Sequence, residues 1–180
     1  LFSIGLVELE LDGTVRLQGG QPIPTYDQEI IEGFAHVFTG WTYAGSPSFS
    51  SGVRDYVRPM IAFEAFHDTG EKRLLRGAIL PAGRTAAEDL KDALDTIFSH
   101  PNVAPFISRQ LIQRLVTSNP SPGYVRRVAQ RFEDDGRGVR GNLGAVVRAI
   151  LFDDEARRGH LDASLTFGKL KEPLLRLSAT

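Results

Sequence analysis

The chain has 180 residues, of which 24% are charged, and a formal net charge of −1. This composition is typical of a globular domain and long enough for one hydrophobic core. Because the net charge is near zero, no overall field favours nucleic acid or an anionic membrane. The absence of cysteine excludes disulfides, thiolate metal sites and a cysteine nucleophile. No apolar run reaches the roughly 20 residues of a membrane-spanning helix.

The first residues, LFSIGLVELELDG, lack an initiator methionine and begin in an apolar segment. We therefore expect a fragment of a longer protein, for which a missing signal peptide carries no information about location. Residues 1–180 are expected to form a single helical domain. Within it, an irregular region at 1–84 contains one helix, and a helical array occupies 85–180.

In the first region, the patterns predict one helix among turns. The Asp-Gly pair at 12–13 separates two apolar segments and predicts a small hairpin. A helix is expected to start at Thr25, which precedes Gln28 by the spacing of a capping box, and to end at Gly40. Segment 42–58 is rich in Ser, Gly and Pro and predicts an exposed loop. RGAIL predicts a short strand.

In the second region, helix caps are explicit. Thr85 and Glu88 have capping-box spacing, and further helices are expected to begin at Asn102, Ser121 and Asn142. The first of these helices is expected to bury the stripe Leu90, Ala93, Leu94, Ile97 and Phe98. The second is expected to bury Ile107, Leu111 and Leu115.

Together these elements predict a mainly α-helical fold. We expect an array of about five or six amphipathic helices with short antiparallel connections, and an irregular N-terminal third with at most a small hairpin. The sixth helical segment is FGKLKEPLLRLSAT, with Pro173 in its first turn.

The middle of the chain is basic. Residues 101–148 carry eight arginines against three carboxylates, a net charge of +5. Such a surface fits a phosphate group or a carboxylate-rich partner, but it is also typical of a solvated face or of one that pairs with an acidic region. Five arginines are expected on the outer helix surface: Arg109, Arg114, Arg126, Arg127 and Arg131.

The segment FHDTGEKRLLRGAILPAG (66–83) concentrates reactive side chains. His67 has the chemistry of an acid or base, Asp68 that of a group that orients it, and Lys72 that of a clamp for an anion. However, neighbouring residues on an extended chain point to opposite faces, and HDTG is also typical of a turn. The sequence therefore leaves two interpretations of this segment: a reactive site, or a turn. What distinguishes them is whether His67 and Lys72 face the same side.

Other motifs are assigned structural roles. Gly136, Gly138 and Gly141 form G-x-G-x-x-G, but a helix precedes them instead of a strand, so we expect a linker between helices. The histidines and carboxylates lack the spacing of a di-metal bundle, and no metal or cofactor is expected. Trp41 either lines a pocket or continues the apolar stripe of the preceding helix, and its spacing favours the core.

The order of several motifs resembles one protein family. They are LFSIGLVELELDGT, YDQEIIEGFAHVFTGWTY, FHDTGEKRLLRGAILPAG and LDTIFSHPNVAPFISRQLIQRLVTSNP. Together they resemble the C-terminal half of the bacterial "domain of unknown function 1800" family, over nearly the whole chain. The resemblance implies a largely helical fold without an established activity. Its recurrent features correspond to Phe38-Thr39-Gly40-Trp41, His67-Asp68 with Gly70 and Lys72, His100-Pro101, and Lys171 with Pro173.

One departure from the family pattern concerns a turn. The family's H-D-x-G-x-K motif is usually followed by Thr-Phe-Leu-Gly, whereas this chain has Arg-Leu-Leu-Arg-Gly at 73–77. The glycine therefore comes one residue later than the family pattern implies, and the geometry of this turn is left open.

Two functions are open. The first is a helical binding or scaffold module of an exported or envelope-associated protein, because no complete catalytic constellation is present. Its candidate binding residues are Trp41, Tyr43, Arg109 and Arg127. The second is a hydrolase acting on an envelope substrate, with His67, Asp68 and Lys72 as the catalytic residues.

The resemblance also implies a location and a partner. Family members are mostly exported, which implies the periplasm or envelope for the parent protein. Their genes often neighbour those of sulfatase- or phosphatase-like proteins, which implies a protein partner of that type. No nucleic acid is expected.

Overall fold

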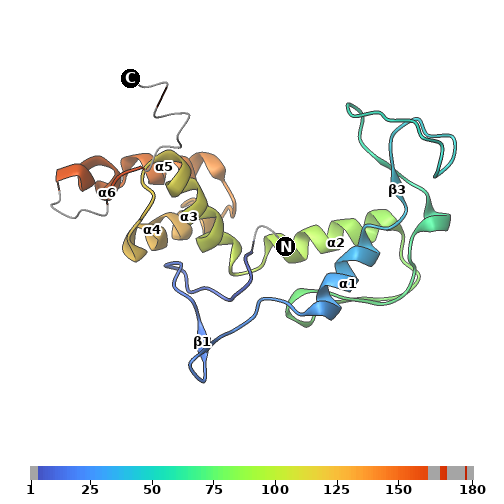
Figure 1. Ribbon diagram of the computed structural model, residues 1–180, viewed down its shortest axis with the longest axis horizontal. Coiled ribbons are helices and arrows are strands. Elements are labelled where there is room, and N and C mark those ends of the chain that lie inside the picture. The colour runs from blue at the N-terminus through green and yellow to red at the C-terminus, as the bar shows by residue number, and fades with distance from the viewer. Residues whose placement is uncertain (1–3, 162–166, 170–176, 178–180) are drawn as a thin grey trace. The chain divides into compact units, whose positions relative to one another are not determined.

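The computed structural model describes residues 4–161, 167–169 and 177. Within these residues there are six α-helices, and the strands form only two-residue antiparallel pairs. Short loops join the helices from α2 onward, whereas a long irregular segment with two strand pairs separates α1 from α2. The predicted mainly α-helical fold is therefore confirmed (Figure 1). The chain divides into two compact units. One spans Pro24–His100, and the other combines the segment that ends at Ile23 with the segment that starts at Pro101. None of the described helices is long and apolar enough to cross a membrane.

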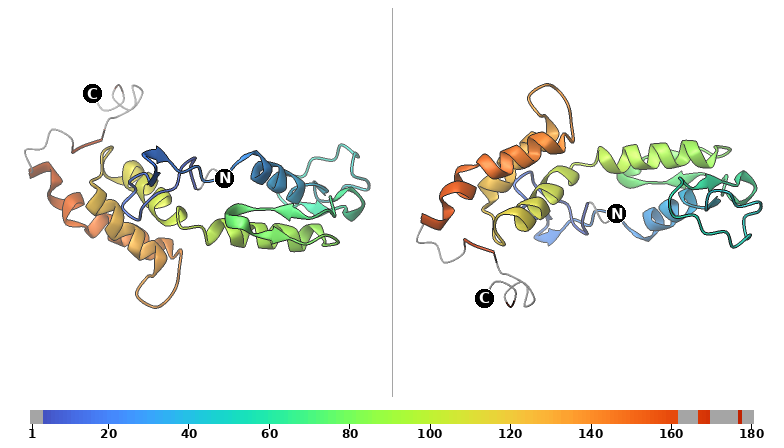
Figure 2. Two further views of the ribbon diagram at one scale, coloured as in Figure 1. Left: turned by 90° about the horizontal axis from the view of Figure 1, so that it is seen from below. Right: turned by 90° about the horizontal axis from the view of Figure 1, so that it is seen from above.

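The 24–100 unit packs its first helix against a hairpin and against its second helix. Figure 1 shows the two helices of this unit, and Figure 2 shows them from two further sides. Its elements are α1 (Gln28–Val37), β3 (Trp41–Thr42), β4 (Ile61–Ala62), β5 (Lys72–Arg73), β6 (Ile79–Leu80) and α2 (Ala86–Phe98). β3 pairs with β4 and β5 with β6, so the strand expected in RGAIL is present as β6.

Helix α1 begins two residues later than the sequence predicts. Its N-cap is Asp27, whose carboxylate accepts a hydrogen bond from Ile30 N at 3.0 Å, so the predicted Thr25 cap is wrong. Aspartate is a better N-cap than threonine. On the buried face, a Cβ at Gly33 would lie 2.0 Å from Arg73 O. Only glycine therefore allows β5 to approach the helix this closely.

Helix α2 begins with the predicted capping box of Thr85 and Glu88. Its buried face, however, is centred on Ala86, Asp89 and Ala93. Leu94 is 51% exposed, so the predicted core position of this residue is wrong, and Phe98 is also exposed. The reason is that the Asp89 carboxylate lies in the middle of the buried face and binds residues outside the helix. A pattern of apolar residues does not predict such a face.

Near the hairpin predicted at 12–13, Leu9 and Val15 form an antiparallel bridge around Gly13, which has φ +80°. A second pair follows, β1 (Leu17–Gln18) with β2 (Gln21–Pro22). The buried side chain of Asn102 holds this ribbon. It accepts from Leu9 N at 2.9 Å and donates to Ile4 O and Val7 O at 2.8 and 2.7 Å. Asn102 precedes its helix but makes no side-chain cap bond, so its predicted capping role is wrong.

The second unit, which contains this ribbon, has the helices α3 (Val103–Leu115), α4 (Pro122–Glu133), α5 (Leu143–Phe152) and α6 (Asp154–Arg158). α4 packs against both α3 and α5 (Figure 1). The predicted caps at Ser121 and Asn142 are confirmed. The core contains Ile112, Val128, Val146, Ile150 and Tyr124, whose hydroxyl donates to Ile150 O at 2.7 Å.

In α3 the buried face differs from the predicted stripe. Ala104, Ser108 and Ile112 are fully buried, whereas Leu115 is half exposed, so its predicted core position is wrong. Two residues of this buried face, Ala104 and Ser108, are small. A prediction from large apolar side chains therefore favours the adjacent stripe of Ile107, Leu111 and Leu115. The sixth predicted helical segment, with Lys171 and Pro173, lies outside the described residues except for 167–169 and 177.

Candidate functional site

The H-D-x-G-x-K motif surrounds a buried carboxylate that belongs to α2. Asp89 is fully buried, and one of its oxygens lies 2.8 Å from Lys72 Nζ and 3.2 Å from His67 Nε2. Its other oxygen accepts from Arg84 Nε at 2.7 Å. We call His67, Lys72, Arg84 and Asp89 the Asp89 cluster. His67 and Lys72 thus face the same side, toward a residue that the sequence reasoning missed.

The cluster is closed to solvent at its centre. The side chains of His67 and Asp89 are 0% exposed and that of Lys72 is 1% exposed. Besides its ion pair, the Lys72 ammonium donates to Asp68 O at 2.5 Å and to Gly70 O at 2.9 Å. An ammonium group has three N–H donors, so all three are used within the protein. Lys72 therefore fastens the turn that carries Asp68.

Burial alone raises the pKa of Asp89, but hydrogen bonds from Lys72, Arg84 and His67 outweigh it, so that the pKa lies below the usual 3.8. Arg84 extends the network toward the surface, since it also pairs with the half-exposed Asp92 at 2.5 Å. Asp89 lies at helical spacing between Ala86 and Ala93 on the buried face of α2, and a buried charge requires partners. The predicted stripe did not include this residue.

The FTGW segment lies directly against the same turn. Thr39 Oγ1 accepts from Asp68 N at 2.8 Å and donates to His36 O at 2.6 Å. Gly40 has φ +80°, and a Cβ there would lie 3.0 Å from both His67 N and Phe63 O. Two features of the sequence, 28 residues apart, are therefore parts of one packed structure.

Asp68 is paired with a different histidine from the one expected. Its carboxylate contacts His36 Nδ1 and accepts from Gly70 N at 2.7 Å. The Gly70 bond and the His36 contact lower the pKa of Asp68. The His36 side chain is 52% exposed, so this dyad, unlike the Asp89 cluster, faces solvent. No local spacing links residues 36 and 68, so the sequence alone carries no signal for this pair.

Trp41 and Tyr43 lie in a separate, aromatic part of the 24–100 unit. Trp41 is half-buried and pairs with Ala62 in the β3–β4 ladder, while Tyr43 meets Tyr56 edge-to-face at 5.4 Å between ring centroids. Among the described residues, the buried Trp41 Nε1 has no hydrogen-bond partner.

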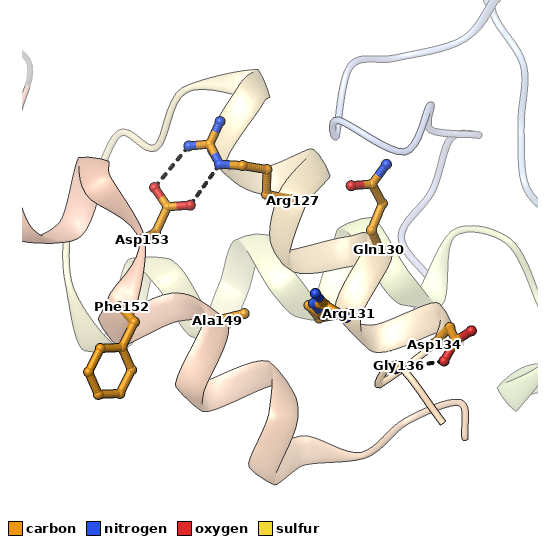
Figure 3. A pocket seen from close by; sticks show the side chains of 8 residues that line it. All are labelled: Arg127, Gln130, Arg131, Asp134, Gly136, Ala149, Phe152 and Asp153. Carbon is orange, nitrogen blue, oxygen red and sulfur yellow. Dashed lines mark hydrogen bonds and ion pairs between the residues drawn. The ribbon is translucent and has the colours of Figure 1, made fainter. Parts of the chain in front are cut away.

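Arg127 lines a cavity of about 600 Å³ on α4 and α5, which we call the α4–α5 cavity. Figure 3 shows side chains reaching it from both helices, and its lining comprises Arg127, Gln130, Arg131, Asp134, Gly136, Ala149, Phe152 and Asp153. Arg127 forms a two-pronged ion pair with Asp153, at 2.7 and 2.8 Å. Arg109 lines a different cavity of about 520 Å³, where Phe106 and the ribbon at 5–15 meet.

The G-x-G-x-x-G segment is a linker between α4 and α5, as predicted. Asp134 accepts from Gly136 N and Gly138 N at 2.7 and 2.9 Å, and Asp135 accepts from Arg137 N and from the Asn142 amide. In a nucleotide site the backbone N–H groups of such a loop would donate to a phosphate, whereas here they donate to the carboxylates of Asp134 and Asp135.

Across the described residues, no three His, Asp or Glu side chains gather as metal ligands would. Glu64, three residues before His67, accepts instead from Ala86 N at 3.0 Å, at the start of α2. The carboxylate thereby helps to cap a helix.

Comparison with known proteins gives one finding. No curated protein and no solved structure is similar to the chain. A family model described as "Protein of unknown function (DUF1800)" matches residues 1–180. The chain therefore belongs to the DUF1800 family.

Proposed function

We propose that the chain is a helical binding module, and that the α4–α5 cavity is its contact site. The observation that carries the proposal is the burial of the motif's charged side chains. His67 and Lys72 are 0% and 1% exposed and both contact Asp89, so they stabilise the 24–100 unit and have no surface left for a substrate. The α4–α5 cavity, in contrast, is open and lined by charged side chains.

The size of the cavity agrees with this role. Sites for small molecules, or for a side chain of a partner, commonly measure 300–1,000 Å³ and combine apolar walls with a few polar groups. Here Ala149 and Phe152 supply the apolar wall, and Arg127, Gln130 and Arg131 supply the polar groups.

The proposal places the module in an exported or envelope-associated protein. The family resemblance of the sequence supports this location and a sulfatase- or phosphatase-like partner. Fractionation of the native host, with an antibody against the chain, tests the location: recovery from the periplasm or envelope is expected, and recovery from the cytoplasm alone would reject it.

Crosslinking in the host cell tests binding. The tagged parent protein is captured as wild type, as Arg131→Gln in the cavity and as Arg148→Gln on α5. The two variants remove the same charge, but Arg148 does not line the cavity. A partner retained by wild type and R148Q but lost from R131Q is the expected result. Equal recovery by all three proteins, or no partner with any of them, contradicts the proposal.

A second candidate function is hydrolysis of an envelope substrate, and the His36–Asp68 dyad favours it. A carboxylate on Nδ1 orients an imidazole and leaves its other nitrogen available for proton transfer. In this alternative His36 is the base and Asp68 orients it. His67 and Lys72 are positioning residues, because they hold the turn that carries Asp68.

Turnover of chromogenic phosphate, sulfate, carboxylate and glycoside esters tests this alternative. Activity that falls in His36→Gln but not in the exposed control His160→Gln supports it. If no ester is hydrolysed, or if both variants retain full activity, His36 is not a catalytic base for these substrates.

A further inference from the structure

We propose that the α4–α5 cavity binds an oxyanion, of the phosphate or carboxylate class, that is carried on an apolar or aromatic body. The inference rests on the proposed binding role and names the ligand chemistry of that site. The evidence comes from four residues that line the cavity: the guanidinium of Arg131, the carboxylates of Asp134 and Asp153, and the exposed ring of Phe152.

The guanidinium belongs to Arg131. It lines the cavity from α4, and within the described part of the chain no hydrogen bond or ion pair engages it. A Cβ at Gly136 would lie 3.2 Å from its Nη1, so the glycine leaves room for the guanidinium beside the linker. A guanidinium stays charged at all physiological pH values and presents five N–H donors in a planar fork suited to phosphate and carboxylate oxygens.

The carboxylates of the cavity are already engaged. Burial alone raises the pKa of Asp153, but hydrogen bonds from Arg127 and Glu155 N lower it overall. Backbone hydrogen bonds from Gly138 and Gly136 lower the pKa of Asp134. Both groups therefore remain anionic at neutral pH. Both oxygens of Asp153 and Oδ1 of Asp134 accept from protein donors, and Figure 3 draws the bonds to Arg127 and Gly136.

Arg131 is thus the cationic group left for a ligand. Arg127 contributes less, because its Nε and Nη2 are held by Asp153, although its Nη1 has no partner among the described residues. A carboxylate or phosphate on Arg131 would form charge-assisted hydrogen bonds, which are about twice as strong as neutral ones.

The apolar body is inferred from Phe152. Its side chain lines the cavity although the residue is 70% exposed, and Ala149 lies one turn before it on α5. An aromatic residue and a cationic group that line one cavity are complementary to a ligand with an apolar body and an anionic end. A cavity of about 600 Å³ holds a phenyl ring together with a phosphate group.

Calorimetric titration of the purified chain tests the inference with four probes: inorganic phosphate, phenyl phosphate, benzoate and phenol. We expect saturable binding of phenyl phosphate or benzoate, and the tighter of the two identifies the oxyanion class. Phenol and inorganic phosphate should bind more weakly, since each lacks one half of the ligand. No saturable binding of either aromatic anion at millimolar concentration overturns the inference.

Two variants locate the site. Arg131→Gln should weaken binding of the aromatic anion about tenfold or more, whereas the control Arg148→Gln should change it less than about twofold. Phe152→Ala should weaken phenyl phosphate but leave inorganic phosphate unchanged. Equal losses in R131Q and R148Q would show general charge attraction in place of a site. Because Arg131 and Phe152 are exposed, unchanged circular dichroism is expected for these variants.

The two proposals fail separately. If the aromatic anion binds wild type but not R131Q and no cellular partner is captured, the cavity site stands and the proposed binding role falls. If a partner is captured independently of Arg131 and no probe binds, the cavity site falls.

Discussion

Asp89→Asn is the substitution that tests the Asp89 cluster most directly. It keeps the side-chain volume but removes the negative charge from contacts at 2.7, 2.8 and 3.2 Å with Arg84, Lys72 and His67. It also directs an amide N–H₂ toward groups that are themselves donors. Lys72, only 1% exposed, would lose its buried counter-charge.

Removing one partner of a buried ion pair destabilises a protein by about 3–5 kcal/mol. The chain has a single tryptophan, Trp41, and it lies in the same unit as Asp89. Its fluorescence during guanidinium unfolding therefore reports on this unit. With a denaturant slope of about 3 kcal/mol/M, we expect the midpoint to fall by about 1–1.7 M.

The matched control is Asp92→Asn, which lies one turn further along α2. Asp92 shares Arg84 as a partner, but its side chain is 41% exposed, and exposed ion pairs contribute little. We expect a much smaller change in the midpoint. If D89N and D92N unfold at the same guanidinium concentration, the buried cluster does not stabilise the unit.

The same cluster predicts a pH dependence. Because the pKa of folded Asp89 lies below its usual 3.8, the stabilisation is complete above that value and is lost as the pH falls through the folded pKa. The difference in stability between wild type and D89N should therefore be constant near neutral pH and shrink below about pH 4. A difference that grows on acidification contradicts the assigned sign.

Three further substitutions test local features. Arg76, at φ 57° in the β5–β6 turn, should tolerate glycine, and R76G should raise stability by about 0.5–1 kcal/mol in the tryptophan assay. Gly33→Ala would place a Cβ 2.0 Å from Arg73 O and should lower stability by about 1–3 kcal/mol or more; wild-type stability would refute the close approach. Asn102→Ala should speed hydrogen exchange at the Leu9 amide about tenfold, and unchanged exchange would refute the tether.

Local features of the fold were predictable because they depend on neighbouring residues. The capping box at Thr85 and the caps at Ser121 and Asn142 each need only three or four consecutive positions. The helical class follows from them. The errors arose where a cap was assigned from spacing alone, as at Thr25, and where a buried face contains a charge or small side chains, as in α2 and α3.

The candidate site was less predictable because its contacts span distant residues. The motif H-D-x-G-x-K singled out His67 and Lys72, but their common partner, Asp89, belongs to another helix. The His36–Asp68 pair joins residues 32 positions apart. In the turn whose geometry the sequence left open, Arg76 takes the left-handed conformation at φ 57°, and Gly77 follows it at φ 74°.

The tether at Asn102 also constrains the order of events during synthesis. The ribbon at 4–9 is translated before the entire 24–100 unit, yet the side chain that binds it comes only after that unit. Domains generally fold as units while the chain emerges from the ribosome. The whole 24–100 unit therefore emerges before Asn102, and the ribbon cannot bind Asn102 until then. A pause in translation before residue 102 would therefore prolong the time for which Ile4 O, Val7 O and Leu9 N lack their Asn102 partner.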